Sequence, residues 1–420
     1  MVYSFPKNLK PRGLFDELIP FLDEKEIVLL YGMRQTGKTS LLYLLANYLT
    51  LKRKIDRKQI VYFDLENISD YEALEFLKDY DQFIQLLKDR HKADLKKRVY
   101  VFIDEIQHLH NPSSFLKYLY DHYNEKIKFV VTGSSSLEIK KKFTDALTGR
   151  IFRFEVLPLD FHEFIDFSGL TPSPASFERF VIFGGFPAVV LKKEPQIRMK
   201  LLKDIYSLYV RRDIRDLGAM EDVLSFNKLI TLLAARLGGL ISETSLSNVV
   251  GISRPTVKNY LFILQNTFVI TLLTPFFTNP KKEVTKAPKI YFSDSGIRNA
   301  VVDNFAPLFK RKDAGNLVEN TVFSELKKSF ADKVHFWRSE EKQEVDFIVE
   351  KDSPVPVEVK YQSFKKPIIP ESLIFFIKKY RPDRAFVLTK NFEEKSRFDQ
   401  TQVFFSPCWK INKIVKSFLF

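Results

Sequence analysis

The stretch that begins at Gly32 has the residue types and the spacing of a loop that binds phosphate groups. It reads Gly-Met-Arg-Gln-Thr-Gly-Lys-Thr-Ser and lies between two apolar runs. Glycines let the backbone curl, so that several N–H groups point at one anion, and a helix N-terminus adds partial positive charge. Lys38 would contact the β- and γ-phosphates of ATP, and the hydroxyl of Thr39 would bind Mg²⁺. We expect nucleotide contacts from Gly32, Arg34, Gln35, Thr36, Gly37, Lys38, Thr39 and Ser40.

An acidic pair, Asp104-Glu105, follows a second apolar run, Val99–Ile103. A buried strand would deliver Asp104 at its carboxyl end, beside the phosphate loop. Asp104 would then bind Mg²⁺ directly or through water, and Glu105 would orient and deprotonate the attacking water. The alternative is an ordinary turn at the edge of a sheet. The pair therefore predicts hydrolysis as well as binding of the nucleotide.

Two further side chains could act on the same phosphates. Ser134, or else Ser135, follows an apolar run, and its hydroxyl could contact the γ-phosphate or the attacking water; a helix N-cap is the structural alternative. Arg150 could reach the nucleotide of a neighbouring subunit and stabilise charge on the transferring phosphoryl group. A surface or salt-bridging role is the alternative for it and for its competitors, Arg153, Arg211, Arg212 and Arg215.

A second constellation lies near the carboxyl end of the chain. In Glu358-Val-Lys360 the period of two puts Glu358 and Lys360 on one face of a strand. Asp346, on a neighbouring strand, could meet Glu358 around Mg²⁺, and Glu319 would complete the metal site or support its ligands. The metal would lower the pKa of a bound water and bind the oxygens of a scissile phosphate, and Lys360 would orient that water or neutralise developing charge. The alternative is a solvated strand face on a domain that only binds.

Alternation of apolar and amphipathic segments predicts the elements that position the first site. Strands are expected at Glu26–Tyr31, Ile60–Asp64, Arg98–Asp104 and Lys128–Thr132. Helices are expected at Leu41–Leu51, Tyr71–Leu87 and Ser113–Tyr123. This order predicts an α/β fold with a parallel sheet covered on both faces. A strand between the two motifs and a Glu after Asp104 are typical of ATP-hydrolysing P-loop proteins rather than of small GTPases.

The middle of the chain predicts helices over about 177–226 and then a winged helix-turn-helix over Ile241–Leu273. Gly251 would make the turn and Ser253 would cap the second helix. Leu246, Val249 and Val250 are expected to face one way, and Val257, Leu261 and Leu264 are expected in the core. Outward residues that could contact phosphates and bases are Arg254, Thr256, Lys258 and Asn259, and a basic wing would carry Lys281, Lys282, Lys286 and Lys289. The alternative is a winged helix that serves only as a packing module.

The last hundred residues predict a helix over Asn316–Phe330, strands over 334–338, 344–349 and 355–360, a helix over Pro370–Tyr380 and a strand over Arg384–Leu388. Helix, three strands, helix, strand resembles the core of restriction-type nucleases of the PD-(D/E)XK superfamily. Pro354 and Pro356 flank the strand that carries Glu358, which suggests an edge strand.

The motifs taken together resemble archaeal and bacterial AAA-type ATPases joined to a C-terminal domain of unknown function. They are GMRQTGKTS, FIDEIQ, TGSSS, LTGR, LPLDFHEF, FGGFP, YVRRDI, KIYFSDSG and NLVEN, in this order along nearly the whole chain. The resemblance implies ATP binding and hydrolysis, and it supplies no biological role.

Composition limits the class of protein. A chain of 420 residues exceeds one hydrophobic core, and 45% hydrophobic residues suffice for several. The single cysteine, Cys408, allows no intramolecular disulfide, which fits a reducing cytoplasm. No apolar run is long enough to span a bilayer, so no membrane partner is expected. A net charge of +14 makes a polyanion such as nucleic acid a plausible partner.

We therefore expect an AAA-type ATPase core in 1–165, a helical lid in 166–225, a winged helix in 226–300 and a nuclease-like α/β domain in 301–420. The first functional hypothesis is a cytoplasmic ATPase that acts on or binds nucleic acid, with DNA favoured. A homo-oligomer is a candidate assembly, because an arginine finger would come from a neighbouring subunit. The second is a nucleotide-switched signalling or scaffold protein whose C-terminal domain binds partners without cleavage. The third is a DNA-binding regulator that uses the winged helix.

Overall fold

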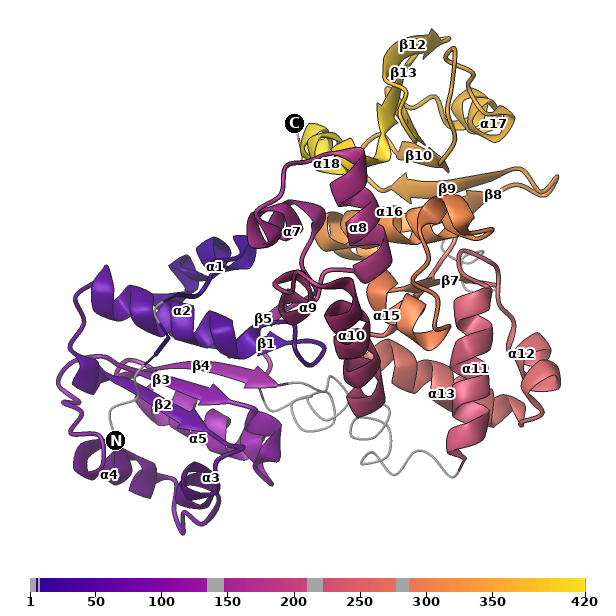
Figure 1. Cartoon of the computed structure of the whole chain (residues 1–420). Coiled ribbons are helices and arrows are strands. Elements are labelled where there is room, and N and C mark those ends of the chain that lie inside the picture. Colours follow the sequence, from indigo (N-terminus) through magenta and orange to yellow (C-terminus); the bar gives the residue numbers. More distant parts are fainter. Residues whose placement is uncertain (1–4, 7, 134–146, 210–221, 277–286, 420) are drawn as a thin grey trace. The chain divides into compact units, whose positions relative to one another are not determined.

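The structure is a computed structural model that describes residues 5–6, 8–133, 147–209, 222–276 and 287–419 (Figure 1). Its contacts divide the chain into two compact units, Met1–Leu157 and Pro158–Phe420. The division lies a few residues before the expected boundary at 165. The finer division of the second unit into lid, winged helix and C-terminal domain stays a prediction. Each unit is described by itself.

The described part of the first unit contains a five-stranded parallel sheet in the order β2-β3-β4-β1-β5. The strands are β1 (Ile27–Tyr31), β2 (Ile60–Asp64), β3 (Val99–Asp104), β4 (Ile127–Gly133) and β5 (Ile151–Glu155). The first four confirm the expected strands. β5 was not predicted, because its residues are only partly buried and show no continuous apolar run. In the sheet it is β4 that separates the strand before the phosphate loop from the strand before the acidic pair, whereas β2 lies at the edge.

Helices cover this sheet on both faces because its strands are apolar on both sides (Figure 1). Ile27 and Leu29 pack in one core cluster, whereas Val28 and Leu30, which point the opposite way, pack in the other. The helices are α1 (Gly13–Leu18), α2 (Lys38–Leu51), α3 (Ile68–Glu75), α4 (Asp81–Asp89) and α5 (Pro112–Tyr123). The single helix expected over Tyr71–Leu87 is two helices, since the Asp79 carboxylate accepts from the Asp81 N–H at 3.0 Å and starts a new helix.

The amino-terminal half of the second unit is mainly helical. Its elements are α7 (Phe161–Ser168), α8 (Pro174–Phe183), α9 (Pro187–Val190), α10 (Pro195–Tyr209), α11 (Val223–Ala235), α12 (Glu243–Val250), α13 (Arg254–Asn266), β6 (Ile270–Leu273), β7 (Lys289–Phe292) and α15 (Ser295–Val301). The Gly184-Gly185 turn has a steric cause: a Cβ on Gly184 would lie 2.1 Å from the carboxylate of Asp294, which caps α15 and accepts from the Gly185 N–H at 2.7 Å.

Helices α12 and α13 and the turn between them lie where the sequence predicts two helices and a turn, and one side chain differs from expectation. Gly251 ends α12 with φ +81°, and the Ser253 hydroxyl accepts from the Thr256 N–H at the start of α13. Leu246 and Val250 are buried, as are Val257, Leu261 and Leu264. Val249, expected to face the same way as Leu246 and Val250, is instead 60% exposed. The expected wing residues Lys281, Lys282 and Lys286 lie outside the described residues.

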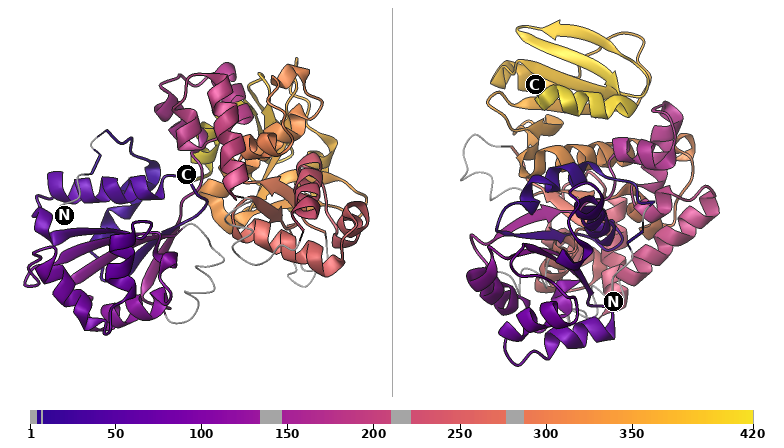
Figure 2. Two further views of the ribbon diagram at one scale, coloured as in Figure 1. Left: turned by 60° about the horizontal axis from the view of Figure 1, so that its bottom comes forward. Right: turned by 90° about the vertical axis from the view of Figure 1, so that its left-hand side faces the viewer.

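The carboxyl-terminal half of the second unit is built on a six-stranded sheet of order β12-β13-β11-β10-β9-β8. Its elements are α16 (Ala314–Phe330), β8 (Val334–Arg338), β9 (Glu344–Val349), β10 (Val355–Lys360), α17 (Glu371–Tyr380), β11 (Arg384–Thr389), β12 (Glu394–Phe398), β13 (Thr401–Pro407) and α18 (Ile411–Leu419). The expected order of helix, three strands, helix and strand is therefore present. Helix α18 lies beside the strands of this sheet (Figure 2). Its Phe418 contacts Phe386 of β11 and Phe330 of α16.

The expectation that β10 is an edge strand is wrong. It pairs antiparallel with β9 and parallel with β11. Proline is tolerated because pairing with β11 begins at Val357, one residue after Pro356, so the missing N–H falls at the start of the strand. Short 3-10 helices complete the fold at Pro20–Leu22, Arg57–Gln59, Ile106–His108, Leu308–Lys310, Ala331–Lys333 and Cys408–Lys410. Within the described ranges, every helix is too short or too polar to cross a membrane.

Candidate functional site

The phosphate loop joins β1 to α2, and its backbone requires glycine at two positions. Gly32 has φ +145°, and a Cβ there would lie 2.5 Å from the carbonyl oxygen of Val156. Gly37 has φ +97° in the left-handed region and precedes the first residue of α2. Gln35 also has a positive φ of 62°. The glycines that the motif predicted are thus explained by close approach and by backbone conformation.

Lys38 and Arg12 hold this loop in shape. The Lys38 ammonium group donates to the carbonyl oxygens of Gly32 at 3.0 Å and Met33 at 2.8 Å, and the residue is 4% exposed. One Arg12 nitrogen donates to the carbonyl oxygens of Thr36 and Leu157, both at 2.9 Å. Arg12 therefore ties the loop to the end of the unit, and sequence reasoning missed it because an isolated arginine before the first helix gives no motif.

Asp104 lies at the centre of a hydroxyl network at the carboxyl ends of the strands. Its carboxylate accepts from the hydroxyls of Thr39 at 2.6 Å, Tyr62 at 3.0 Å and Thr132. Burial raises the pKa of Asp104, and the hydrogen bonds from Thr132 and Thr39 oppose this shift. The structure thus brings together Thr39 and Asp104, the two residues that the sequence assigned to Mg²⁺.

Glu105 is positioned by its backbone. It has φ +56° and follows the last residue of β3, and its N–H donates to the Thr132 hydroxyl at 2.9 Å. The amide of Gln107 donates to the Glu105 carboxylate. Thr132 therefore contacts both members of the acidic pair, accepting from one and donating to the other.

Thr132 of β4 is a residue of this network that the sequence analysis did not single out, since only the serines after it were considered. Ser134 and Ser135 lie outside the described residues, so their role stays a prediction. The available signal was a hydroxyl residue inside an otherwise apolar strand, and Thr132 is fully buried.

Arg150 lies away from the phosphate loop within its own unit. It precedes β5, where its carbonyl oxygen accepts from the N–H of Ile27, the first residue of β1. The loop follows the other end of β1, so Arg150 is at the opposite edge of the parallel sheet. Its guanidinium pairs with Asp121 at 2.7 Å. A role toward a neighbouring subunit stays a prediction for Arg150, and Arg211, Arg212 and Arg215 lie outside the described residues.

The residues around Asp104 fit a magnesium–nucleotide complex by their chemistry. Mg²⁺ is usually held by one or two carboxylates together with substrate phosphates and waters. Thr39 and Asp104 supply a hydroxyl and a carboxylate 2.6 Å apart at the start of α2. We infer that these two residues would hold the ion.

The second constellation is also assembled, on β9, β10 and α16. The Lys360 ammonium lies 2.7 Å from the Glu358 carboxylate, which confirms that the two share a strand face. The Asp346 carboxylate accepts from the Val359 N–H at 2.8 Å, and the Glu358 carboxylate accepts from the Asp346 N–H at 3.3 Å. Burial and then the nearby Asp346 raise the pKa of Glu358 to about 7.

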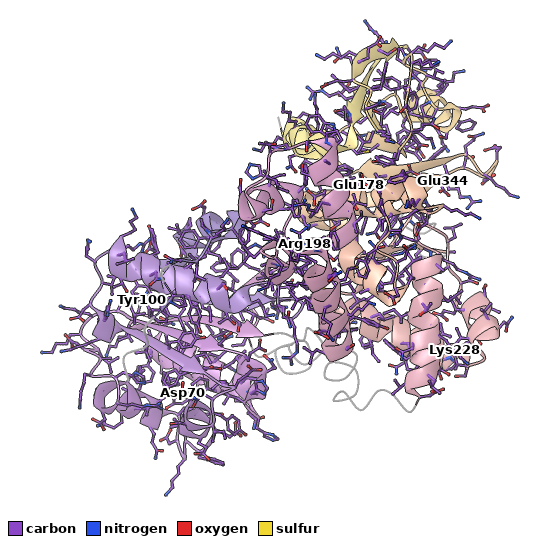
Figure 3. All side chains as sticks on the ribbon, viewed as in Figure 1. Asp70, Tyr100, Glu178, Arg198, Lys228 and Glu344 are labelled. Carbon is purple, nitrogen blue, oxygen red and sulfur yellow. The ribbon has the colours of Figure 1, made fainter. Side chains whose placement is uncertain are left out.

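Lys289 enters this cluster from β7, which contradicts its expected place in an exposed basic wing. Its ammonium lies 2.6 Å from Glu344, 3.7 Å from Glu319 and 4.0 Å from Asp346, and the side chain is 2% exposed. Glu344 lies on β9 (Figure 3). Burial disfavours the charged form of Lys289, but the surrounding carboxylates outweigh burial and raise its pKa. Burial and then Asp346 raise the pKa of Glu319 to about 8.

The metal site expected from Glu319, Asp346 and Glu358 does not fit this arrangement. Among the side chains that the structure describes, no three or more His, Cys, Asp or Glu groups are placed to hold a metal ion. An ammonium group lies where the expected cation would meet the carboxylates of Glu319 and Asp346. No cleavage step through a metal follows from these residues.

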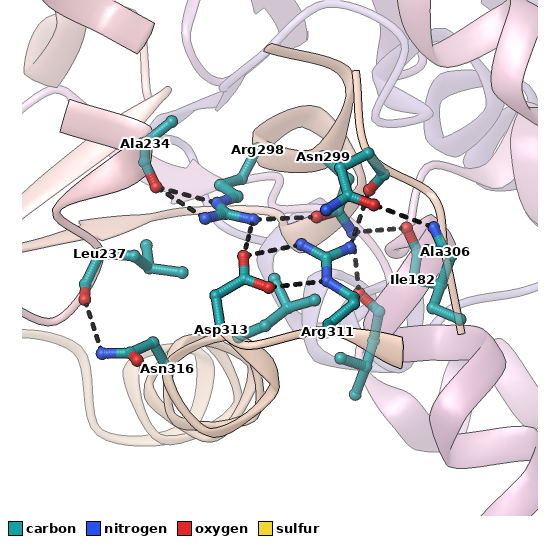
Figure 4. A network of polar contacts seen from close by, with 12 residues as sticks. Ile182, Ala234, Leu237, Arg298, Asn299, Ala306, Arg311, Asp313 and Asn316 are labelled. Carbon is teal, nitrogen blue, oxygen red and sulfur yellow. Dashed lines mark hydrogen bonds and ion pairs between the residues drawn. The ribbon is translucent and has the colours of Figure 1, made fainter. Parts of the chain in front are cut away.

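A polar network anchors the start of α16, the helix that carries Glu319 (Figure 4). The Asp313 carboxylate accepts two bonds from Arg311, at 2.8 and 2.9 Å, and pairs with Arg298 at 2.6 Å. Arg298 also donates to the carbonyl oxygen of Ala234 in α11 at 2.8 and 3.0 Å. The Asn316 amide donates to the Leu237 carbonyl oxygen at 3.0 Å. Elements far apart in the sequence are therefore fixed around one carboxylate.

Three family models match the chain in succession. An "AAA domain" matches residues 24–165, a "Domain of unknown function (DUF8612)" matches 174–308, and a "Domain of unknown function (DUF4143)" matches 314–410. The order agrees with the resemblance to AAA-type proteins that carry a C-terminal domain of unknown function.

Curated relatives cover most of the chain and carry no assigned activity. An uncharacterized protein of Haemophilus influenzae is 26% identical over 404 residues, which are 94% of this chain and 96% of that protein. An uncharacterized protein of Methanocaldococcus jannaschii is 27% identical over 369 residues, which are 84% of this chain and 77% of that protein.

Among solved structures, the ADP form of the ORC2 protein of Aeropyrum pernix is 14% identical, covers 72% of this chain and 95% of that chain, and has a TM-score of 0.38. The AMPPCP-bound DnaA of Aquifex aeolicus is 15% identical, covers 60% of this chain and 86% of that chain, and has a TM-score of 0.32. The match of residues 24–165, together with the parallel sheet and the loop between β1 and α2, identifies the first unit as a P-loop ATPase domain of the AAA type.

Proposed function

We propose that the protein binds and hydrolyses ATP in its first unit and binds nucleic acid, with DNA favoured, through its second unit. The observation that carries the ATP part is the network of Thr39, Asp104, Thr132 and Glu105 beside the phosphate loop. The experiment that tests it is ATP turnover in the Lys38→Ala variant.

The residues of the first unit would have separate roles in ATP binding and hydrolysis. The loop N–H groups, the start of α2 and the Lys38 ammonium would bind the phosphates. Glu105 would accept a proton from the attacking water. It directly follows Asp104, the last residue of β3, whose carboxylate is bonded to Thr39. Bound magnesium would neutralise phosphate charge. The position of Glu105 depends on Thr132, because that hydroxyl accepts from the Glu105 N–H.

We expect Thr132→Val to lower ATP turnover about ten- to a hundredfold with little change in ATP affinity, because a displaced catalytic group costs rate rather than binding. Valine keeps the volume and removes both hydrogen bonds of the hydroxyl. Thr132→Ser keeps the hydroxyl and should retain most of the activity. Phosphate release and a fluorescent ATP analogue measure the two quantities. A variant with normal turnover would contradict the positioning role.

The nucleic-acid part of the proposal is supported by one face of α13. Arg254, Lys258 and Asn259 are exposed on this helix, and its core positions are buried on the other side. Helix side chains of these types contact phosphates and base edges. The net charge of +14 acts in the same direction.

A second candidate function is a nucleotide-switched scaffold in which ATP orders contacts and the second unit binds partners without cutting. The observation that favours it is the buried Lys289 within the acidic cluster, which leaves the expected nuclease site without its metal arrangement. This candidate requires no affinity for DNA.

We expect duplex DNA to bind with an affinity that falls steeply as salt rises, because phosphate contacts release counterions. Arg254→Ala and Lys258→Ala should each weaken binding about three- to tenfold and flatten the slope by about one contact. Lys228→Ala, a change of an exposed lysine on α11, is the matched control (Figure 3). Fluorescence anisotropy over a salt series measures both. Absent or salt-independent binding would favour the scaffold.

A further inference from the structure

The acidic cluster of the second unit consists of Glu319, Glu344, Asp346 and Glu358, and it comes with its own cations. Lys289 contacts the first three carboxylates, and Lys360 lies 2.7 Å from Glu358. The remaining partner is Arg338, 3.5 Å from Glu344. Four carboxylates therefore face three cationic groups within the part of the chain described, so most of their charge is already compensated.

Lys289 is built into this position by its strand. β7 pairs antiparallel with β6, with Lys289 opposite Leu273, and a bridge joins Lys289 to Leu240. Side chains alternate along a strand, so Lys289 and Tyr291 point to the same side. The Tyr291 hydroxyl donates to Glu319 at 2.6 Å. One strand thus delivers an ammonium group and a phenol to the same carboxylates.

Because Lys289 is buried, its ammonium group and the surrounding carboxylates stabilise each other. The side chain is 2% exposed, and its ammonium lies 5.6 Å from the ring centre of Phe336. A buried ammonium group needs carboxylate partners, and buried carboxylates need a cation. A divalent metal at Asp346 and Glu319 would repel the ammonium group and would compete for the same oxygens.

We propose that Lys289 is the resident counter-ion of this cluster and excludes a divalent metal from it. Glu319, Glu344 and Asp346 are arranged around the ammonium group and not around a metal ion, so a metal site would form only when the Lys289 ammonium is removed and the carboxylates close on the ion. Exclusion of a metal by Lys289 depends neither on ATP hydrolysis nor on DNA binding, because every residue of the cluster lies in the second unit.

The test is a titration of the nucleotide-free full chain with Mn²⁺, in which the electron paramagnetic resonance signal of free Mn²⁺ measures how much has bound. Asp346→Asn isolates the contribution of the cluster, because any Mn²⁺ held by the ATPase unit is common to all variants. Wild type should bind no more Mn²⁺ than Asp346→Asn. Lys289→Met should gain a site at least tenfold tighter, and Lys289→Met combined with Asp346→Asn should lose it. Lys289→Arg keeps the charge and should behave as wild type.

Two results would overturn the proposal. The first is a Mn²⁺ site in wild type that Asp346→Asn removes. The second is a folded Lys289→Met variant, checked by circular dichroism, that gains no Mn²⁺ affinity. If Lys289→Met does not fold, the comparison of wild type with Asp346→Asn still decides, because equal binding supports exclusion and a difference contradicts it.

Discussion

Lys38→Ala should lower ATP turnover by at least about a hundredfold and weaken ATP binding, because charged groups that contact the transferring phosphoryl contribute rate factors of this size. The lysine is fixed for this task. Its ammonium donates to two carbonyl oxygens of its own loop, at 2.8 and 3.0 Å, and it is nearly buried. Phosphate release and the affinity for a fluorescent ATP analogue measure the effect.

The matched control is Lys52→Ala. Lys52 follows the last residue of the same helix, α2, and is exposed, so its loss changes the net charge equally without touching the loop. Turnover in the control should stay within about twofold of wild type, in line with the small effects of surface substitutions. Equal activity of Lys38→Ala and wild type would remove the site assignment.

The phosphate loop could be predicted from sequence because its chemistry is local. Gly32 and Gly37 are required by positive φ angles and close packing, and Lys38 and Thr39 follow them directly. Asp104 could be predicted because an apolar run ends at it. Thr132 and Arg12 could not be found in this way, because their roles depend on hydrogen bonds to distant residues. Thr132 bonds to Asp104, 28 positions away, and Arg12 bonds to Thr36, 24 positions away.

The error at Lys289 has a physical cause. Lysine is almost never fully buried unless it is paired, so a lysine beside other lysines predicts an exposed surface. Its partners, Glu319 and Glu344, are supplied by α16 and β9, and only the folded chain brings them to β7. The proximity of Glu358 and Lys360 could be predicted from sequence, because alternate side chains of one strand point to the same face.

The network at Asp313 depends on tertiary contacts in the same way. Arg298 is 3% exposed, and its guanidinium has Asp313 as a charged partner and the Ala234 carbonyl as a neutral one. Removing the carboxylate would leave the buried guanidinium groups of Arg298 and Arg311 with only neutral hydrogen-bond acceptors. The loss of one partner from a buried ion pair costs more than the pair itself contributes, because the other charge stays buried.

Asp313→Ala should therefore lower the free energy of unfolding of the second unit by about 2–3 kcal/mol, less than for a fully buried pair because Asp313 retains some exposure. Both tryptophans, Trp337 and Trp409, lie in this unit, so tryptophan fluorescence in urea reports its unfolding. Asp332→Ala is the control. Its pair with Lys327 has the same 2.6 Å separation but is exposed, and should contribute about 0–1 kcal/mol.

The contribution of Asp313 to the free energy of unfolding should also depend on pH, and it should decrease as the pH falls. Hydrogen bonds from Arg311 and the charge of Arg298 hold the pKa of Asp313 below its usual value, although burial opposes them. A carboxylate whose pKa is lower in the folded state contributes stability above its unfolded pKa of about 4, and this stability is lost as the pH falls further. The difference between wild type and Asp313→Ala should thus be constant near pH 7 and shrink below about pH 4. A difference that stayed constant down to pH 2 would show that Asp313 acts through packing, and that its charge does not hold Arg298 and Arg311 in place.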